Sequence, residues 1–164
     1  MQPRHVPLAL VGLVAAASLA CGGMLSAAGK AQEAAINLNM DARLGRAEFC
    51  LEHVEPKDRE NFTKIHAAWG KKLRVVDSEI VAFKMGKDDE AADVDVQVSW
   101  YQPQYGELHV TVLHQKWKAI NGDWYLSSEE RVDGDTGLMG EHVEIARPEA
   151  PPPNAIFQTV RIGE

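Results

Sequence analysis

The stretch HQKWKAINGDWYLSSEERV, residues 114–132, decides the fold of this chain. Two runs of alternating polar and apolar residues flank Asn121-Gly122, and this dipeptide between such runs is the strongest short signal for a β-hairpin. Counting outward from a two-residue turn predicts four cross-strand pairs: Ile120 with Asp123, Trp117 with Leu126, Gln115 with Ser128, and His114 with Glu129. The turn therefore predicts which side chains share a face of the sheet.

The two predicted faces of this hairpin differ in polarity. One face is mainly apolar and holds Leu113, Gln115, Trp117, Trp124, Leu126, Ser128 and Val132. The other face is mixed and holds Val112, His114, Lys116, Lys118, Tyr125, Ser127, Glu129 and Arg131. In an antiparallel sheet with one buried side, the apolar face lies on the core, so we expect the first face to pack against helices.

The preceding sequence predicts two helices followed by two further strands. Apolar residues spaced by three and four predict a helix from Asn39 to Val54 and a second from Pro56 to about Leu73. Period-two alternation predicts strands over residues 75–85, 91–101 and 108–119, the last being the first arm of the hairpin. Helices followed by strands indicate the α+β class, with helices packed on an antiparallel sheet of four or more strands.

This order of elements, with the pattern W-x-x-x-x-G-x-W-x-L at Trp117–Leu126, resembles the nuclear transport factor 2-like superfamily. The resemblance covers about residues 37–132 and implies a curved sheet in a cone-shaped, cystatin-like fold. The chain looks most like the uncharacterised lipoprotein members. The same fold serves ketosteroid isomerases, polyketide cyclases and many exported domains, so the resemblance implies no single activity.

The N-terminal segment MQPRHVPLALVGLVAAASLACGG predicts export. One basic residue, Arg4, precedes an apolar run from Val6 to Ala20, which is the order of a secretory signal. The end of this run at Cys21 resembles a bacterial lipoprotein signal, which implies lipidation of Cys21 and attachment to a membrane of the cell envelope. Two alternatives stay open: cleavage that releases a soluble protein, and an uncleaved transmembrane anchor, since about 20 apolar residues span a bilayer.

These features divide the chain into four parts. We expect a signal peptide over residues 1–20, a lipidated cysteine and tether over 21–36, the folded domain over 37–142, and a Pro-rich linker with a C-terminal docking segment over 143–164. The docking segment is the apolar run AIFQTVRI, which we expect to dock on its own domain or on a neighbour. Cys50 is expected to be a small buried hydrophobe.

Charge and motif content exclude several classes of protein. The net charge of −7, without a dense basic patch, argues against a nucleic-acid partner. The six histidines are scattered without the spacing of metal ligands, and the loop at residues 133–141 is expected to be a turn, so we expect no metal and no cofactor. No nucleophile motif or phosphate-binding loop is present in the sequence.

The apolar face of the hairpin gives a candidate ligand-binding set. Polar groups among tryptophans need hydrogen-bond partners, and in the fold that the chain resembles this face lines the cavity of the cone. The set consists of Gln115, Trp117, Trp124, Ser128 and Tyr101. A hydrogen bond between Gln115 and Ser128 inside the core is the alternative interpretation.

An alternative site is the acid–base pair of His114 and Glu129, in which the carboxylate orients the imidazole. A cross-strand ion pair on an exposed face accounts for the same two residues without catalysis. The superfamily's isomerases use an aspartate base with tyrosine and a protonated acid as donors. The residues of these types here, Asp93, Asp95, Tyr101 and Tyr125, do not form that pattern, since both aspartates alternate with the valines of a strand.

The sequence thus predicts an exported, membrane-tethered domain that binds a small apolar ligand or a protein partner without catalysis. A structural envelope module or homodimer, with its cone filled by Trp117, Trp124 and Phe83, is the first alternative. A small-molecule isomerase or hydrolase that uses His114 and Glu129 is the second.

Overall fold

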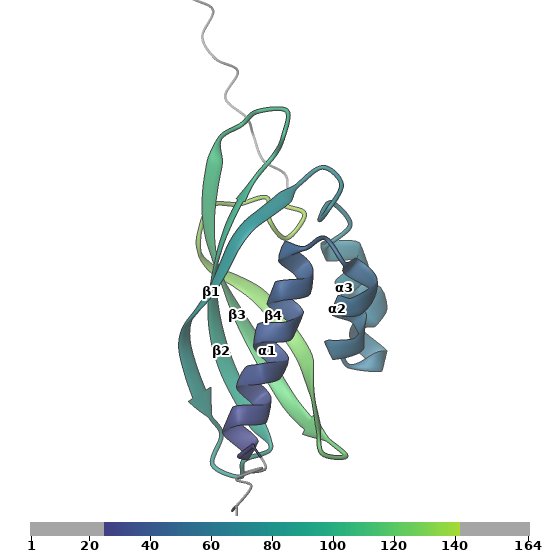
Figure 1. The fold of residues 1–164 in the computed structure, drawn as a ribbon, viewed down its shortest axis with the longest axis vertical. Helices are drawn as coiled ribbons and strands as arrows, with labels where there is room; N and C mark the ends of the chain where they lie inside the picture. The colour runs from purple at the N-terminus through teal and green to yellow at the C-terminus, as the bar shows by residue number, and fades with distance from the viewer. Residues whose placement is uncertain (1–24, 142–164) are drawn as a thin grey trace, which may run out of the picture.

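The computed structural model describes residues 25–141. The predicted signal peptide, Cys21 and the predicted linker and docking segment at 143–164 lie outside the described residues. Four antiparallel strands form one unclosed, curved sheet in the order β1-β2-β3-β4, and the helices precede them in the chain (Figure 1). The predicted α+β class, with helices packed on an antiparallel four-stranded sheet, is therefore confirmed.

The strands follow the alternation in the sequence. They are β1 (Arg74–Met85), β2 (Ala91–Tyr101), β3 (Leu108–Ile120) and β4 (Asp123–Gly134). Every second residue of β2 from Ala92 to Trp100 is buried, as predicted. Asn121 and Gly122 both have positive φ, 54° and 92°, which is what a tight two-residue hairpin turn requires. The hairpin that decides the fold is thus confirmed at its turn.

The first helix begins much earlier than the sequence pattern predicted. α1 (Ala27–Arg43) is capped by Ser26, whose hydroxyl accepts a hydrogen bond from the backbone N–H of Gly29 at 3.1 Å. Residues 27–36, which the sequence assigned to the tether, form the first part of α1, and two of them, Ala31 and Ala35, are buried in the core. The core side of α1 is a stripe of small residues with one leucine and one amide: Ala31, Ala35, Leu38, Asn39 and Ala42.

The helix predicted from Asn39 to Val54 is also wrong. α1 ends at Arg43, and Gly45 turns the chain with a φ of +70° before the short α2 (Ala47–Cys50) and the 3₁₀ turn η1 (Leu51–His53). Met40 and Leu44, which the predicted helix would have buried, are exposed. The apolar residues spaced by three and four therefore belong to separate helical elements on either side of the turn at Gly45.

The second predicted helix starts correctly and ends early. The 3₁₀ turn η2 (Pro56–Asp58) leads into α3 (Arg59–Ile65), and the chain then turns before β1. Gly70, with a φ of +71°, lies so close to Gly45 that a Cβ there would be 3.3 Å from the Gly45 Cα atom. α1 crosses the inner face of the sheet, and α2 and α3 lie beside it (Figure 1).

Four extra residues interrupt the sheet and change its register. In β1 the extra residues are Val76 and Val81, and in β4 they are Ser127 and Val132. The β3–β4 pairs match the prediction from Ile120–Asp123 to Trp117–Leu126. Beyond Ser127 the prediction is wrong by one residue, because a bulge places two residues of one strand opposite one of the other.

Candidate functional site

The register change at Ser127 decides which polar residues enter the core. Gln115 pairs with Glu129 instead of Ser128, and His114 pairs with Glu130 instead of Glu129. Glu129 therefore points to the inner face, and its side chain is only 3% exposed. Ser128 is exposed.

The structure does not bring the five predicted ligand-binding residues together. Gln115 and Trp117 are buried in the core, and Trp124 is almost fully buried near the hairpin turn. Tyr101 alternates with the buried Trp100 and so lies on the outer face at the far end of β2. Side chains pack closely around Gln115 on the inner face, where Leu113 and Trp117 are also buried.

The pair of His114 and Glu129 does not exist. His114 lies on the outer face, where its Nδ1 is 2.6 Å from Asp95 Oδ1 and its Nε2 is 3.4 Å from Asp93 Oδ1. Glu129 lies on the inner face, so the sheet separates the two side chains. The acid–base site predicted from these two residues is wrong, and the cause is the extra residue Ser127 in β4.

A chain of buried hydrogen bonds links α1 to the sheet. The Asn39 amide donates to Gln115 Oε1 at 3.2 Å, and the Gln115 amide donates to Asn39 Oδ1 at 3.1 Å. The Trp117 indole N–H also donates to Gln115 Oε1, at 3.3 Å. Gln115 Nε2 donates further to Glu129 Oε1 at 2.6 Å. The predicted bond between Gln115 and Ser128 is thus replaced by bonds to Asn39 and Glu129.

The chain of polar groups ends at His66, which follows α3. His66 Nε2 lies 2.8 Å from Glu129 Oε2, and both side chains are nearly inaccessible, at 5% and 3% exposed. His66 Nδ1 lies 2.8 Å from the Phe62 carbonyl oxygen. Because a carbonyl only accepts, Nδ1 of His66 carries a proton and donates it to Phe62.

His66 and Glu129 line a half-enclosed pocket of about 230 Å³, which we name the α3–β4 pocket. The remaining lining residues are Val54, Asp58, Asn61, Phe62, Ile65, Leu126, Ser127, Ser128 and Met139. Sequence reasoning missed His66 and Asp58. The signal that pointed to His66 was its place four residues after Phe62, on the apolar side of its helix.

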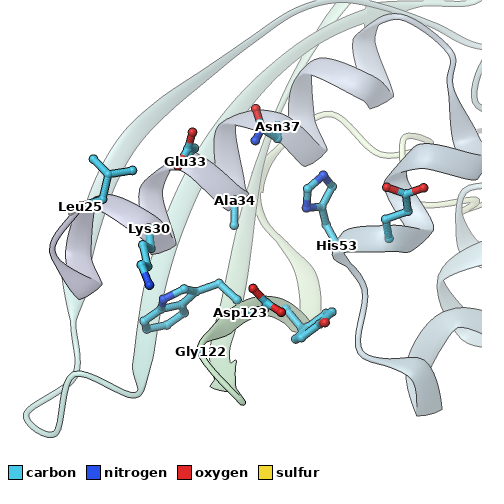
Figure 2. A pocket seen from close by; sticks show the side chains of 11 residues that line it. Leu25, Lys30, Glu33, Ala34, Asn37, His53, Gly122 and Asp123 are labelled. Atoms are coloured by element: carbon cyan, nitrogen blue, oxygen red, sulfur yellow. The ribbon is translucent and has the colours of Figure 1, made fainter. Parts of the chain in front are cut away.

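A second, larger pocket of about 620 Å³ lies between α1 and the tip of the β3–β4 hairpin, and we name it the α1–hairpin pocket (Figure 2). Its lining residues are Leu25, Lys30, Glu33, Ala34, Asn37, Glu52, His53, Gly122, Asp123, Trp124 and Tyr125. Figure 2 shows Ala34 directed from α1 toward the hairpin. The pocket thus combines an apolar wall with polar side chains from three elements.

Cys50 is buried beneath these elements, as predicted. Its thiol donates to the Leu38 carbonyl oxygen at 3.7 Å. Burial, followed by the negative charges of Asp41 and Glu129, raises the pKa of Cys50 to about 12. The thiol therefore stays protonated at neutral pH and is no nucleophile.

Within residues 25–141, no three His, Cys, Asp or Glu side chains converge as a metal site. In the same range, no helix combines the length and the apolar character needed to cross a membrane.

Comparisons with known proteins show the fold alone. No family model matches the sequence, and no curated protein matches it. A SEC-C motif containing protein from Rhodopseudomonas palustris, solved in solution, is 17% identical with a TM-score of 0.55, over 66% of this chain and 83% of that chain. At this identity the likeness supports the α+β architecture and carries no activity across.

Two further solved structures are more distant. A protein of unknown function with a cystatin-like fold from Nostoc punctiforme is 15% identical with a TM-score of 0.47, over 66% of this chain and 91% of that chain. The intermembrane space region of the chloroplast protein ARC6 is 10% identical with a TM-score of 0.47, over 66% of this chain and 98% of that chain.

Proposed function

We propose that this protein is an exported domain, tethered to a membrane through a lipid on Cys21, that binds a small and largely apolar molecule without catalysis. The α1–hairpin pocket is the site. It is the largest pocket described above, and concave sites with an apolar wall and a few polar groups are the usual place for small ligands. In the described part of the chain, no hydrogen bond or ion pair occupies the side chains of Lys30, Glu33 or His53.

The position of the pocket relative to the tether carries this proposal. Leu25 lines the pocket and follows Cys21 by only four positions in the chain. Four residues span at most about 14 Å when fully extended. A lipid on Cys21 would therefore hold the pocket next to the membrane surface, where apolar and amphipathic molecules concentrate.

The test is native mass spectrometry of the full-length protein, purified in mild detergent from the membranes of its own host. We expect a small molecule to accompany the protein and to be lost in Ala34→Phe, which fills the pocket. Ala82→Phe adds the same ring on the outer sheet face and should leave the molecule bound. A molecule retained by Ala34→Phe, or absent from all three proteins, contradicts the proposal. The intact mass also reports whether Cys21 carries a lipid.

An apolar patch on the outer sheet face favours a second candidate, docking of a protein partner or a second copy of the chain. Leu108, Val110 and Val132 are 61%, 38% and 54% exposed. Contiguous exposed apolar residues mark interaction surfaces. In the same spectra, a dimer or a protein adduct that is lost in Leu108→Asp would support this candidate.

A further inference from the structure

The α3–β4 pocket concentrates the unsatisfied polar atoms of the described chain. Across residues 25–141, four buried side-chain oxygen or nitrogen atoms have no hydrogen-bond partner. Three of them, Asp58 Oδ2, His66 Nε2 and Glu129 Oε2, belong to residues that line this one pocket. Buried polar groups in folded proteins are nearly always paired, so this cluster calls for a partner outside the chain.

The surrounding residues of the described chain form no hydrogen bonds with these three atoms. Asp58 is the N-cap residue of α3, yet its side chain makes no capping hydrogen bond. Glu129 Oε2 lies 2.8 Å from His66 Nε2, but the two atoms make no aligned hydrogen bond. The Glu129 carboxylate is held at its other oxygen, Oε1, by Gln115. Its other oxygen, Oε2, is therefore fixed in place beside His66 Nε2, and its two lone pairs let it accept a hydrogen bond from a ligand as well.

The charged residues that line the pocket indicate which kind of ligand fits it. Two of the lining residues are acids, Asp58 and Glu129, and no lining residue is Lys or Arg. Both acids present a free acceptor oxygen, so the complementary group is a cation with several N–H donors. Phe62, Leu126 and Met139 supply an apolar wall beside these oxygens. The volume is far above the ~15 Å³ that a single water molecule needs.

We propose that the α3–β4 pocket binds a small primary amine in its protonated form. The ammonium group donates hydrogen bonds to Glu129 Oε2 and Asp58 Oδ2, and the carbon skeleton of the amine lies against Phe62 and Leu126. This site is separate from the α1–hairpin pocket and shares no lining residue with it. The proposal of an amine site is therefore independent of whether the α1–hairpin pocket holds a ligand.

The test is calorimetric titration of the full-length protein in detergent with ethylamine, butylamine and phenethylamine hydrochlorides. Each amine is matched by its alcohol, and detergent alone is the blank. At least one amine should bind, and its alcohol should bind about tenfold more weakly or not at all, since charge-assisted hydrogen bonds are lost. Equal binding of amine and alcohol, or no binding by any amine at millimolar concentration, overturns the proposal.

Variants locate the site. Glu129→Gln and Asp58→Asn should each weaken the amine about tenfold, because each removes one charged acceptor. Glu130→Gln changes the next residue of β4, which is exposed, and should leave the affinity within about twofold. Ala34→Phe should have no effect, since it fills the other pocket. Asp58 lies at the end of the η2 turn, outside the sheet, so Asp58→Asn serves as the test if Glu129→Gln does not fold. Unchanged affinity in Asp58→Asn overturns the proposal.

Discussion

Two groups of polar side chains meet in the core of this protein, and they differ in whether their hydrogen bonds are complete. Asn39, Gln115 and Trp117 are joined to one another by three hydrogen bonds. His66 and Glu129 each keep one buried atom without a partner. A satisfied buried group helps to hold the fold, whereas an unsatisfied one destabilises it by about 1–3 kcal/mol. The comparison separates residues that hold the fold together from residues that are open to a ligand.

The largest expected effect tests the satisfied group. Gln115→Ala should lower the free energy of unfolding by about 3 kcal/mol or more, because it leaves Asn39 Oδ1 and the Trp117 indole N–H without partners and creates a cavity. Urea unfolding measures this change. Gln97→Ala, on the exposed side of β2, is the matched control and should change stability by less than about 0.5 kcal/mol. Equal losses in the two variants would mean that the buried bonds do not hold α1 to the sheet.

The unsatisfied group should tolerate substitution better. Glu129→Gln is expected to change the free energy of unfolding by less than about 1 kcal/mol in either direction, since an uncharged amide is easier to bury and still accepts from Gln115. The same urea experiment applies. A loss of stability as large as that of Gln115→Ala would show that Glu129 also holds the fold together. The two groups of polar side chains would then not differ as described.

The smallest effect concerns a carboxylate whose bonds are complete. Burial alone would raise the pKa of Glu141, but N–H donors from its own backbone, Gly137 and Met139, together with the Arg131 guanidinium, outweigh burial and lower the pKa. A carboxyl whose pKa is lower in the folded state stabilises the fold above its unfolded pKa, and this stabilisation is lost as the pH falls through the folded pKa.

Glu141→Gln should therefore destabilise the protein at about pH 7 and have less effect at about pH 3, where the carboxyl is protonated in both states. Urea unfolding at the two pH values measures the difference. The matched control is Glu130→Gln, because Glu130 is exposed and no hydrogen bond holds its carboxylate in the described chain. A loss for Glu141→Gln that is the same at both pH values would contradict the argument.

The hairpin shows how far the sequence could predict this structure. Asn121-Gly122 needs positive φ, so the turn and the first pairs up to Trp117 and Leu126 were predictable. The bulge at Ser127 was not, because it replaces a neutral Ser128 with the charged Glu129 on the buried face, and a hydrophobic pattern cannot predict that exchange. The candidate site depended on this register, so its residues were missed.

The start of α1 was missed for a different reason. Ala31, Ala35, Leu38 and Ala42 repeat at spacings of four, three and four, which is a helical stripe. Alanine is the best helix former, yet its small apolar surface makes the stripe weak in hydrophobic terms. The residues were therefore interpreted as a tether. Asn39, where the predicted helix began, is a buried core residue within α1.

The two extra valines of β1 bear on how this protein stays apart from other copies of itself. β1 is an edge strand, with a row of backbone groups that no other strand of the sheet pairs. Its sequence is rich in β-branched residues, and such a strand, if straight, is a template for aggregation. The bulges at Val76 and Val81 interrupt that row twice within twelve residues. The two bulges that bend β1 therefore also make its open edge a poorer template for pairing with another chain.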